Sequence, residues 1–112
     1  MTHKEILDEL RQPVKDLRDH IPAVFDGYRA LNAAVFVDTA LDAKTKELIA
    51  LAVAVTKQCD GCMASHAKGA ARRGATAAEV ADALGVAILM NGGPGSVHAP
   101  RAFQAYQEFA DT

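Results

Sequence analysis

The sequence predicts an all-α fold, a compact bundle of five or six short helices. Half of the 112 residues are hydrophobic and only 5% are aromatic, which suits closely packed helices better than a β-sandwich with its branched and aromatic faces. Apolar residues recur at steps of three and four along much of the chain. Because no linker or low-complexity tract interrupts it, we expect one domain spanning residues 1–112.

The net charge and the N-terminal residues limit the kinds of partner that we expect. A formal net charge of −2 gives no electrostatic footprint for nucleic acid or an anionic membrane. The first ten residues carry charges where a secretory signal needs an apolar core, and no apolar run reaches the roughly 18 residues of a membrane span. We therefore expect a cytoplasmic protein that binds neither nucleic acid nor membrane.

Two amphipathic helices are predicted in the first third of the chain. From Thr2 to about Asp19 the apolar residues form one stripe, with Pro13 expected to kink the helix or delay its start. Pro22 can begin a second helix that continues to about Phe36. We expect both stripes to face the core. The inward residues would be Ile6, Leu7, Leu10, Val14 and Leu17, then Val24, Phe25, Tyr28, Leu31 and Val35.

A central antiparallel hairpin is predicted from helices 43–57 and 59–73. Asp42 can cap the first of them, because its carboxylate can accept from free amides of the first turn. The almost wholly apolar run 48–55 indicates that this helix is central. Gly74 is suited to end the second helix at its C′ position.

Two more helices complete the predicted bundle. The sequence Thr76-Ala77-Ala78-Glu79 matches a capping box and begins a helix to about Met90. The glycine-rich run 91–95 is expected to break the chain, and a last helix to start at Ser96 or Ala99. Its aromatic residues, at three-residue steps, are Phe103, Tyr106 and Phe109.

The residues with the clearest chemistry lie at the start of helix 59–73. Cys59 and Cys62 form a C-x-x-C motif, and His66 follows four residues later on the same helix face. A helix N-terminus favours a thiolate at Cys59, and a nearby imidazole favours one at Cys62. Two such cysteines can close a disulfide, so a sulfenic acid on one can be resolved by the other. The motif thus predicts two-electron redox chemistry without a bound cofactor.

Glu47 is a candidate partner of His66. In a hairpin that turns at residue 58, Glu47 lies opposite Gly69, about 4.5 Å along the axis from His66. The carboxylate could then orient the imidazole or share a proton with it, and Gly69 would let the helices approach closely. The alternative is a solvated glutamate that the helix dipole favours in a first turn.

These residues together resemble the carboxymuconolactone decarboxylase superfamily, in particular its alkylhydroperoxidase D-like branch. The resemblance rests on residues 41–52 and on the C-x-x-C motif with His66, and continues through 74–76, Glu79-Val80 and Ala87 to Gly92-Gly93-Pro94. Between the cysteines this chain has Asp60-Gly61, where alkylhydroperoxidase D carries a serine and a second histidine.

The resemblance implies an all-helical homo-oligomer, a trimer or hexamer, that reduces hydroperoxides. By it, Cys62 would be the peroxidatic cysteine, Cys59 its resolving partner, and Glu47 and His66 a proton relay. The helix-dipole argument alone points to Cys59 as the nucleophile instead. The implied electron donor is a thiol or dithiol, such as a lipoylated protein or a peroxiredoxin.

Three other functions remain open from the sequence. A structural zinc module could use Cys59, Cys62 and His66 with Glu47 or His98 as the fourth ligand. A decarboxylase-type enzyme could use Glu47 or His66 as acid and base on a small lactone, although that branch does not depend on a C-x-x-C pair. A helical assembly domain could hold the cysteines as inert core residues.

The remaining histidines and the terminal helices have simpler predicted roles. His98 is expected at a helix start, although folding could bring it near the thiols, and His3 and His20 are expected on the surface. The small core and alanine-rich surfaces favour a homo-oligomer, with helices in 1–36 or 96–112 as the interface.

Overall fold

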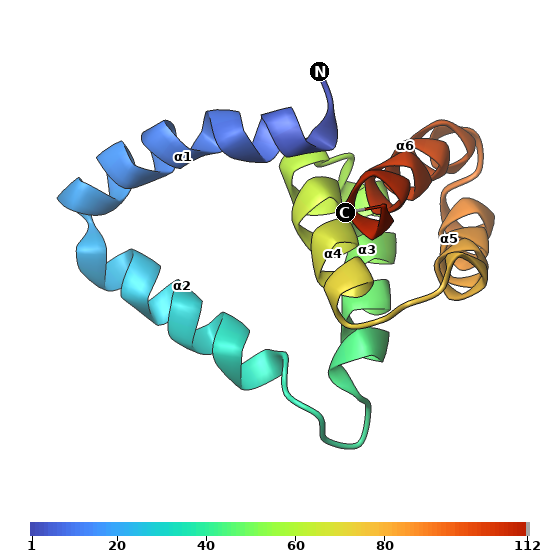
Figure 1. Cartoon of the computed structure of the whole chain (residues 1–112), viewed down its shortest axis with the longest axis horizontal. Helices are drawn as coiled ribbons and strands as arrows, with labels where there is room; N and C mark the ends of the chain where they lie inside the picture. The colour runs from blue at the N-terminus through green and yellow to red at the C-terminus, as the bar shows by residue number, and fades with distance from the viewer. Residues whose placement is uncertain (112) are drawn as a thin grey trace.

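The computed structural model describes residues 1–111, and within that range it contains six helices and no strand (Figure 1). The predicted all-α class is therefore confirmed. The helices are α1 (His3–His20), α2 (Pro22–Val35), α3 (Ala43–Lys57), α4 (Asp60–Arg72), α5 (Ala77–Asn91) and α6 (Gly93–Ala110).

Helices α3 to α6 enclose the core, with α3 and α4 forming the predicted hairpin. Helix α6 packs most extensively against α4 and α5, and α3 lies against α4 and α5. Much of the core is alanine, which allows close helix approach, and its largest fully buried side chains are Leu51, Val55, Met63 and Val80. One face of α3 is left partly uncovered, since Ile49 is 49% exposed.

The predicted caps fix three helix boundaries. Asp42 accepts a hydrogen bond of 2.7 Å from the amide of Thr45. The hydroxyl of Thr76 accepts from the amide of Glu79 at 3.1 Å, and the Glu79 carboxylate accepts from the amide of Thr76 at 2.9 Å. Gly74 follows α4 with a φ of 82°, a left-handed conformation that suits glycine.

The start of α6 differs from the prediction. The helix begins at Gly93, not at Ser96 or Ala99. Gly92 alone breaks the chain, with φ 63° and ψ −131°. Pro94 continues into the helix because the first turn does not use its missing amide hydrogen.

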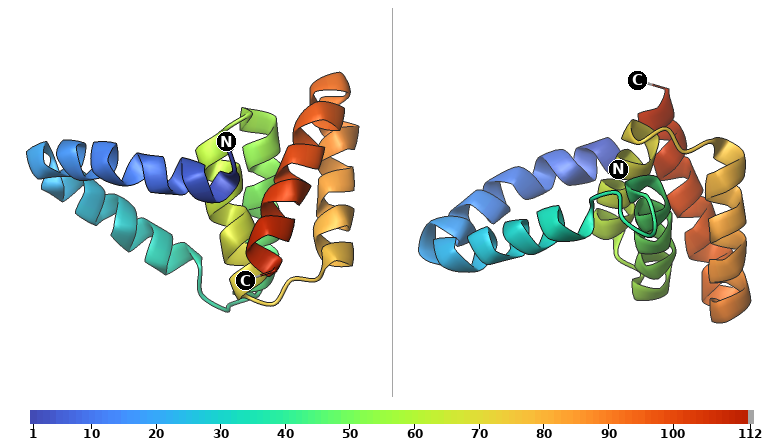
Figure 2. Two further views of the ribbon diagram at one scale, coloured as in Figure 1. Left: turned by 45° about the horizontal axis from the view of Figure 1, so that its top comes forward. Right: turned by 90° about the horizontal axis from the view of Figure 1, so that it is seen from below.

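Helices α1 and α2 form an arm, residues 3–35, that projects from the bundle (Figures 1 and 2). The Cα radius of gyration is accordingly 14.3 Å, above the about 13 Å of a compact chain of this length. Helix α1 runs without interruption through Pro13, so the expected late start is wrong.

The predicted burial of the arm's apolar stripes is also wrong. Helix α2 has no buried residue, and Tyr28 and Leu31 are 68% and 61% exposed. The amphipathic pattern is real, but α2 packs mainly against α1, and within residues 1–111 no other helix covers its stripe. The exposed members are Leu10, Val14, Leu17, Val24, Tyr28, Leu31 and Val35.

The first turn of α1 is held by a carboxylate from α6. Glu108 accepts from the amides of His3 and Lys4 at 3.0 and 3.4 Å, and its Oε2 lies 2.8 Å from Nδ1 of His3. His3 is therefore buried, not on the surface as predicted, whereas His20 is exposed. Burial acts to raise the pKa of Glu108, but the hydrogen bonds from His3 and Lys4 outweigh it and lower that pKa.

Across residues 1–111, no helix combines the length and the hydropathy that crossing a membrane requires.

Candidate active site

The turn between α3 and α4 places the first cysteine. Gln58 adopts a left-handed conformation, with φ 53°, and its amide donates to the carbonyl of Val55 at 3.1 Å. The amide of Cys59 donates to the carbonyl of Ala54 at 3.2 Å. This pair of bonds is a Schellman motif, which ends α3 and leaves Cys59 as the N-cap of α4.

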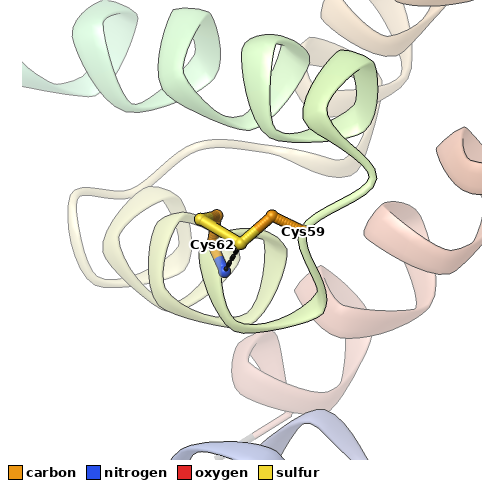
Figure 3. The surroundings of a disulfide bond; sticks show 2 residues. All are labelled: Cys59 and Cys62. Atoms are coloured by element: carbon orange, nitrogen blue, oxygen red, sulfur yellow. Dashed lines mark hydrogen bonds between the residues drawn. A yellow bond between two sulfur atoms is a disulfide. The ribbon is translucent and has the colours of Figure 1, made fainter. Parts of the chain in front are cut away.

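Cys59 and Cys62 form a disulfide across the first turn of α4 (Figure 3). Their Cα atoms are 5.2 Å apart, and the amide of Cys62 donates to Sγ of Cys59 at 3.2 Å. Cys62 is exposed and Cys59 is half-buried. The cysteines are therefore not buried core residues, and the helix N-terminus offers a donor to the sulfur of Cys59.

Glu47 and His66 meet across the α3–α4 interface, as the hairpin geometry predicted. Oε2 of Glu47 lies 3.5 Å from Nδ1 of His66, and Glu47 is only 5% exposed, so it is not a solvated first-turn glutamate. Gly69 makes room for it, because a Cβ atom at that position would overlap the Glu47 carboxylate. A buried carboxylate with a single imidazole neighbour is suited to orient that ring and exchange a proton with it.

An aromatic residue that sequence reasoning missed contacts the other side of the imidazole. Phe36 follows α2, and its ring stacks on that of His66 with centroids 5.7 Å apart and an interplanar angle of 30°. The guanidinium of Arg73 lies 6.0 Å from the centroid of Phe36. No local pattern could have revealed this contact, since Phe36 and His66 are 30 positions apart in the sequence.

The structure brings the site residues together as two pairs. Within residues 1–111, no hydrogen bond joins His66 to either sulfur. Cys62 and His66 are nevertheless four residues apart on α4, so their side chains leave the helix on the same face. His98 lies inside α6 and not at a helix start as expected, and its enclosed Nδ1 has no hydrogen-bond partner in the described range.

The predicted zinc donors are engaged elsewhere. The two sulfurs are bonded to each other, and His66 is paired with Glu47. In the part of the chain that the structure describes, no group of three or more such side chains is placed to hold a metal ion.

The disulfide lies apart from a cavity between α3 and α5. A cavity of about 580 Å³ between α3 and α5 is mostly apolar and is not lined by the disulfide, His66 or Glu47. Its lining includes Leu48, Ile49, Ala52, Val53 and Val86. Cys62 is exposed at the surface, so molecules in solution can reach it.

Comparison with known proteins identifies a family and several relatives of this chain. The model of the carboxymuconolactone decarboxylase family matches residues 22–105. An uncharacterised protein of the cox locus of Paracoccus denitrificans is 43% identical over 86 residues, covering 77% of this chain and 78% of that one. An uncharacterised protein of Haemophilus influenzae is 44% identical over 103 residues, covering 92% and 91%.

Two solved structures share the fold over nearly the whole chain. A carboxymuconolactone decarboxylase family protein from Legionella pneumophila superimposes with a TM-score of 0.92 at 38% identity, covering 96% of each chain. A family member from Thermotoga maritima, for which a role in antioxidative response has been suggested, gives a TM-score of 0.80 at 27% identity. That match covers 94% of this chain and 90% of the other.

Proposed function

The chain belongs to the carboxymuconolactone decarboxylase family, and from this membership and its site we propose that it is a thiol-dependent peroxidase. The observation that carries the proposal is the disulfide Cys59–Cys62 at a helix N-terminus, one turn before an imidazole that a buried carboxylate contacts. The suggested antioxidative role of the Thermotoga relative agrees with it.

The proposed reaction starts from the two reduced cysteines. The thiolate of Cys62 attacks the terminal oxygen of a hydroperoxide, so an S–O bond forms as the O–O bond breaks. The leaving alkoxide takes a proton from the relay and departs as an alcohol. Cys59 then loses its thiol proton, and its thiolate attacks Sγ of the Cys62 sulfenic acid. The S–S bond forms as the S–O bond breaks, and the hydroxyl takes up that proton and leaves as water. Two thiols thereby supply the two electrons that reduce one peroxide.

The exposure of the sulfurs supports Cys62 as the attacking residue. Cys62 is exposed while Cys59 is half-buried, and Cys62 is the cysteine one turn from His66. The hydrogen bond from the Cys62 amide to Sγ of Cys59 instead stabilises negative charge on Cys59. In the proposed sequence that stabilisation serves the second step, in which Cys59 must be a thiolate to resolve the sulfenic acid.

Glu47 and His66 supply and remove protons in this mechanism. His66 can take the proton from the Cys62 thiol and return it to the leaving alkoxide. Glu47, held away from water between α3 and α4, stabilises the protonated imidazole and orients it. A relay of this kind typically contributes about 10²–10⁴-fold in rate.

The disulfide must be reduced for another turnover, and we propose a dithiol donor for that step. An exposed sulfur at Cys62 can be attacked by an incoming thiolate to give a mixed disulfide. A second thiol of the donor then releases both cysteines and leaves the donor oxidised. A dihydrolipoyl group, carried on a lipoylated protein, or a reduced peroxiredoxin has the required pair of thiols.

We propose further that the chain acts as a homo-oligomer, a trimer or hexamer, in which other copies cover the arm. Helix α2 is 14 residues long and buries none of them, and helices of that length are marginal in water without tertiary packing. A second copy has the matching chemistry, because its α3–α5 groove is apolar and exposes Ile49, Val53 and Val86.

The test of the peroxidase proposal counts the oxidised thiols. The reduced protein is treated with half an equivalent of hydrogen peroxide or cumene hydroperoxide, and both cysteines are followed by mass spectrometry, with zinc quantified in the same sample. Because the chain has only two cysteines, each peroxide consumed should remove two thiols. Dihydrolipoamide should restore them.

Variants assign the two roles. Cys62→Ser should abolish the reaction, and Cys59→Ser should stop it at a sulfenic acid that dimedone traps. Ser65→Ala, a matched change at an exposed position of α4, should react as the wild type does. Thiols that stay reduced under peroxide would refute the proposal, and a sulfenic acid trapped on Cys59 would reverse the assignment of the cysteines.

A further inference from the structure

Phe36 is an aromatic neighbour of the proposed relay, and it has no role in the proposed chemical steps. It is half-buried although α2, the helix it follows, buries no residue. Its backbone leaves the helix with φ −88° and ψ 54°, and its amide still donates to the carbonyl of Asn32 at 3.0 Å. The ring is thus turned from the arm onto the bundle, where it lies against His66.

The segment around Phe36 is fixed to the bundle on two sides. The ammonium of Lys46 in α3 donates to the carbonyls of Val35 and Val37 at 2.9 and 2.7 Å, and to the hydroxyl of Thr39 at 2.9 Å. Arg73, just after α4, places its guanidinium 6.0 Å from the ring centroid, within cation–π range. The position of the ring is therefore set by α3 and α4, the two helices that carry the site.

His66 needs such a contact. Its side chain is 24% exposed, and its contact with Glu47, at 3.5 Å, is longer than the roughly 2.7–3.2 Å of an ordinary N–H···O hydrogen bond. One long contact constrains the orientation of the imidazole only weakly. The stacked ring of Phe36 adds a second constraint, because rotation of the imidazole would break the contact between the ring faces.

We propose that Phe36 is a positioning residue, which holds the imidazole of His66 against the carboxylate of Glu47, on the face of α4 that also carries Cys62. This inference rests on the peroxidase function proposed above and adds a residue to it. Phe36 touches no reacting atom and acts only through the orientation of His66.

The experiment compares Phe36→Leu, which keeps apolar volume without the ring, with Phe36→Tyr, which keeps the ring. The second-order rate of peroxide-driven disulfide formation is measured from pH 5 to 9. Loss of the stack should slow the reaction about two- to tenfold, in line with the strength of aromatic pairs, and change the shape of its pH dependence. Phe36→Tyr should restore both, and Phe25→Leu, the same change within α2, should leave both unchanged.

Two further readouts separate positioning from a general effect on the fold. In proton NMR spectra, the ring signals of His66 should lose their ring-current shift in Phe36→Leu and keep it in Phe36→Tyr. Alkylation of the reduced thiols by iodoacetamide, which needs no proton delivery to a leaving alkoxide, should fall less than the peroxide rate.

The outcomes distinguish the two proposals. Wild-type thiols that are inert to peroxide would remove the peroxidase function, and the role of Phe36 with it. A reactive wild type with an equally reactive Phe36→Leu, or a Phe36→Tyr as slow as Phe36→Leu, would remove the role of Phe36 alone.

Discussion

Replacing Gly69 by alanine should change the stability of the protein little and slow the proposed peroxidase reaction strongly. Gly69 lies within α4 and faces Glu47 of α3. A methyl group there would overlap the Glu47 carboxylate, so the carboxylate has to move. Since Glu47 is only 5% exposed, no nearby water replaces the contact with His66.

The expected change in stability is small because two effects oppose each other. A buried carboxylate that loses its partner costs about 1–3 kcal/mol. Alanine in a helix interior is more favourable than glycine by about 1 kcal/mol. The net loss is then about 0–2 kcal/mol, a fall in melting temperature of up to roughly 8 °C for a domain of this size.

The expected change in rate is large. If the displaced carboxylate no longer orients His66, most of the relay contribution should be lost, and peroxide-driven thiol oxidation should slow by about 10²-fold or more. Stopped-flow thiol oxidation and thermal unfolding, measured on the same samples, give the two quantities. The matched control is Gly85→Ala in α5, where a Cβ atom meets nothing within 4 Å.

Gly85→Ala should raise the melting temperature by about 4 °C and leave the rate unchanged. The reasoning would be refuted if Gly69→Ala behaved in the same way. The rate would then not depend on the position of the Glu47 carboxylate between α3 and α4. Glu47→Gln provides an independent check, since it should slow the reaction while leaving Gly69 intact.

Three further predictions concern the α3–α4 turn, the contact of Glu108 with α1, and the arm. Gln58→Gly should stabilise the protein by about 0.5–1 kcal/mol, because residue 58 has a left-handed φ of 53°, and an unchanged or lower melting temperature would contradict this. The pKa of the Glu108 carboxyl group is lowered, since the hydrogen bonds from His3 and Lys4 outweigh the effect of burial. The ionised carboxylate therefore stabilises the fold at pH values above the ordinary pKa of glutamate, and this stabilisation is lost as the pH falls through the lowered pKa. Melting temperatures of wild type and Glu108→Gln should accordingly differ at pH 7 and converge below about pH 4, and a constant difference would argue against the linkage. Leu31→Glu should reduce the molar mass measured by multi-angle light scattering, because it places a charge in the proposed contact between copies. Ala33→Glu, on the opposite face of α2, should not, and equal masses for the two variants would contradict the proposal that another copy covers the arm.

Local signals in the sequence were sufficient where neighbouring residues decide the structure. The Thr76–Glu79 capping box and the Asp42 cap satisfy amides within three residues, so they need no knowledge of the fold. The pairing of Glu47 with His66 was predictable for a related reason, because a tight hairpin makes distance along two helices a matter of counting from the turn.

Other features depend on contacts that no local pattern encodes. His3 was expected on the surface because nothing near it indicates that Glu108, 105 positions later, will accept from it. The apolar stripe of α2 was recognised, but amphipathicity shows only that a helix face needs a cover, not which chain provides it. Phe36 was missed because it reaches the site from a segment that carries no other functional residue.

The grip of Glu108 on residues 3 and 4 has a consequence for biosynthesis. A ribosome makes the first turn of α1 about a hundred residues before the carboxylate that holds it. Throughout that interval the first turn of α1 lacks this partner, and the apolar stripe of the arm stays exposed. The contact between the first turn of α1 and α6 therefore cannot form until the residues of the candidate site, 47–66, have been synthesised.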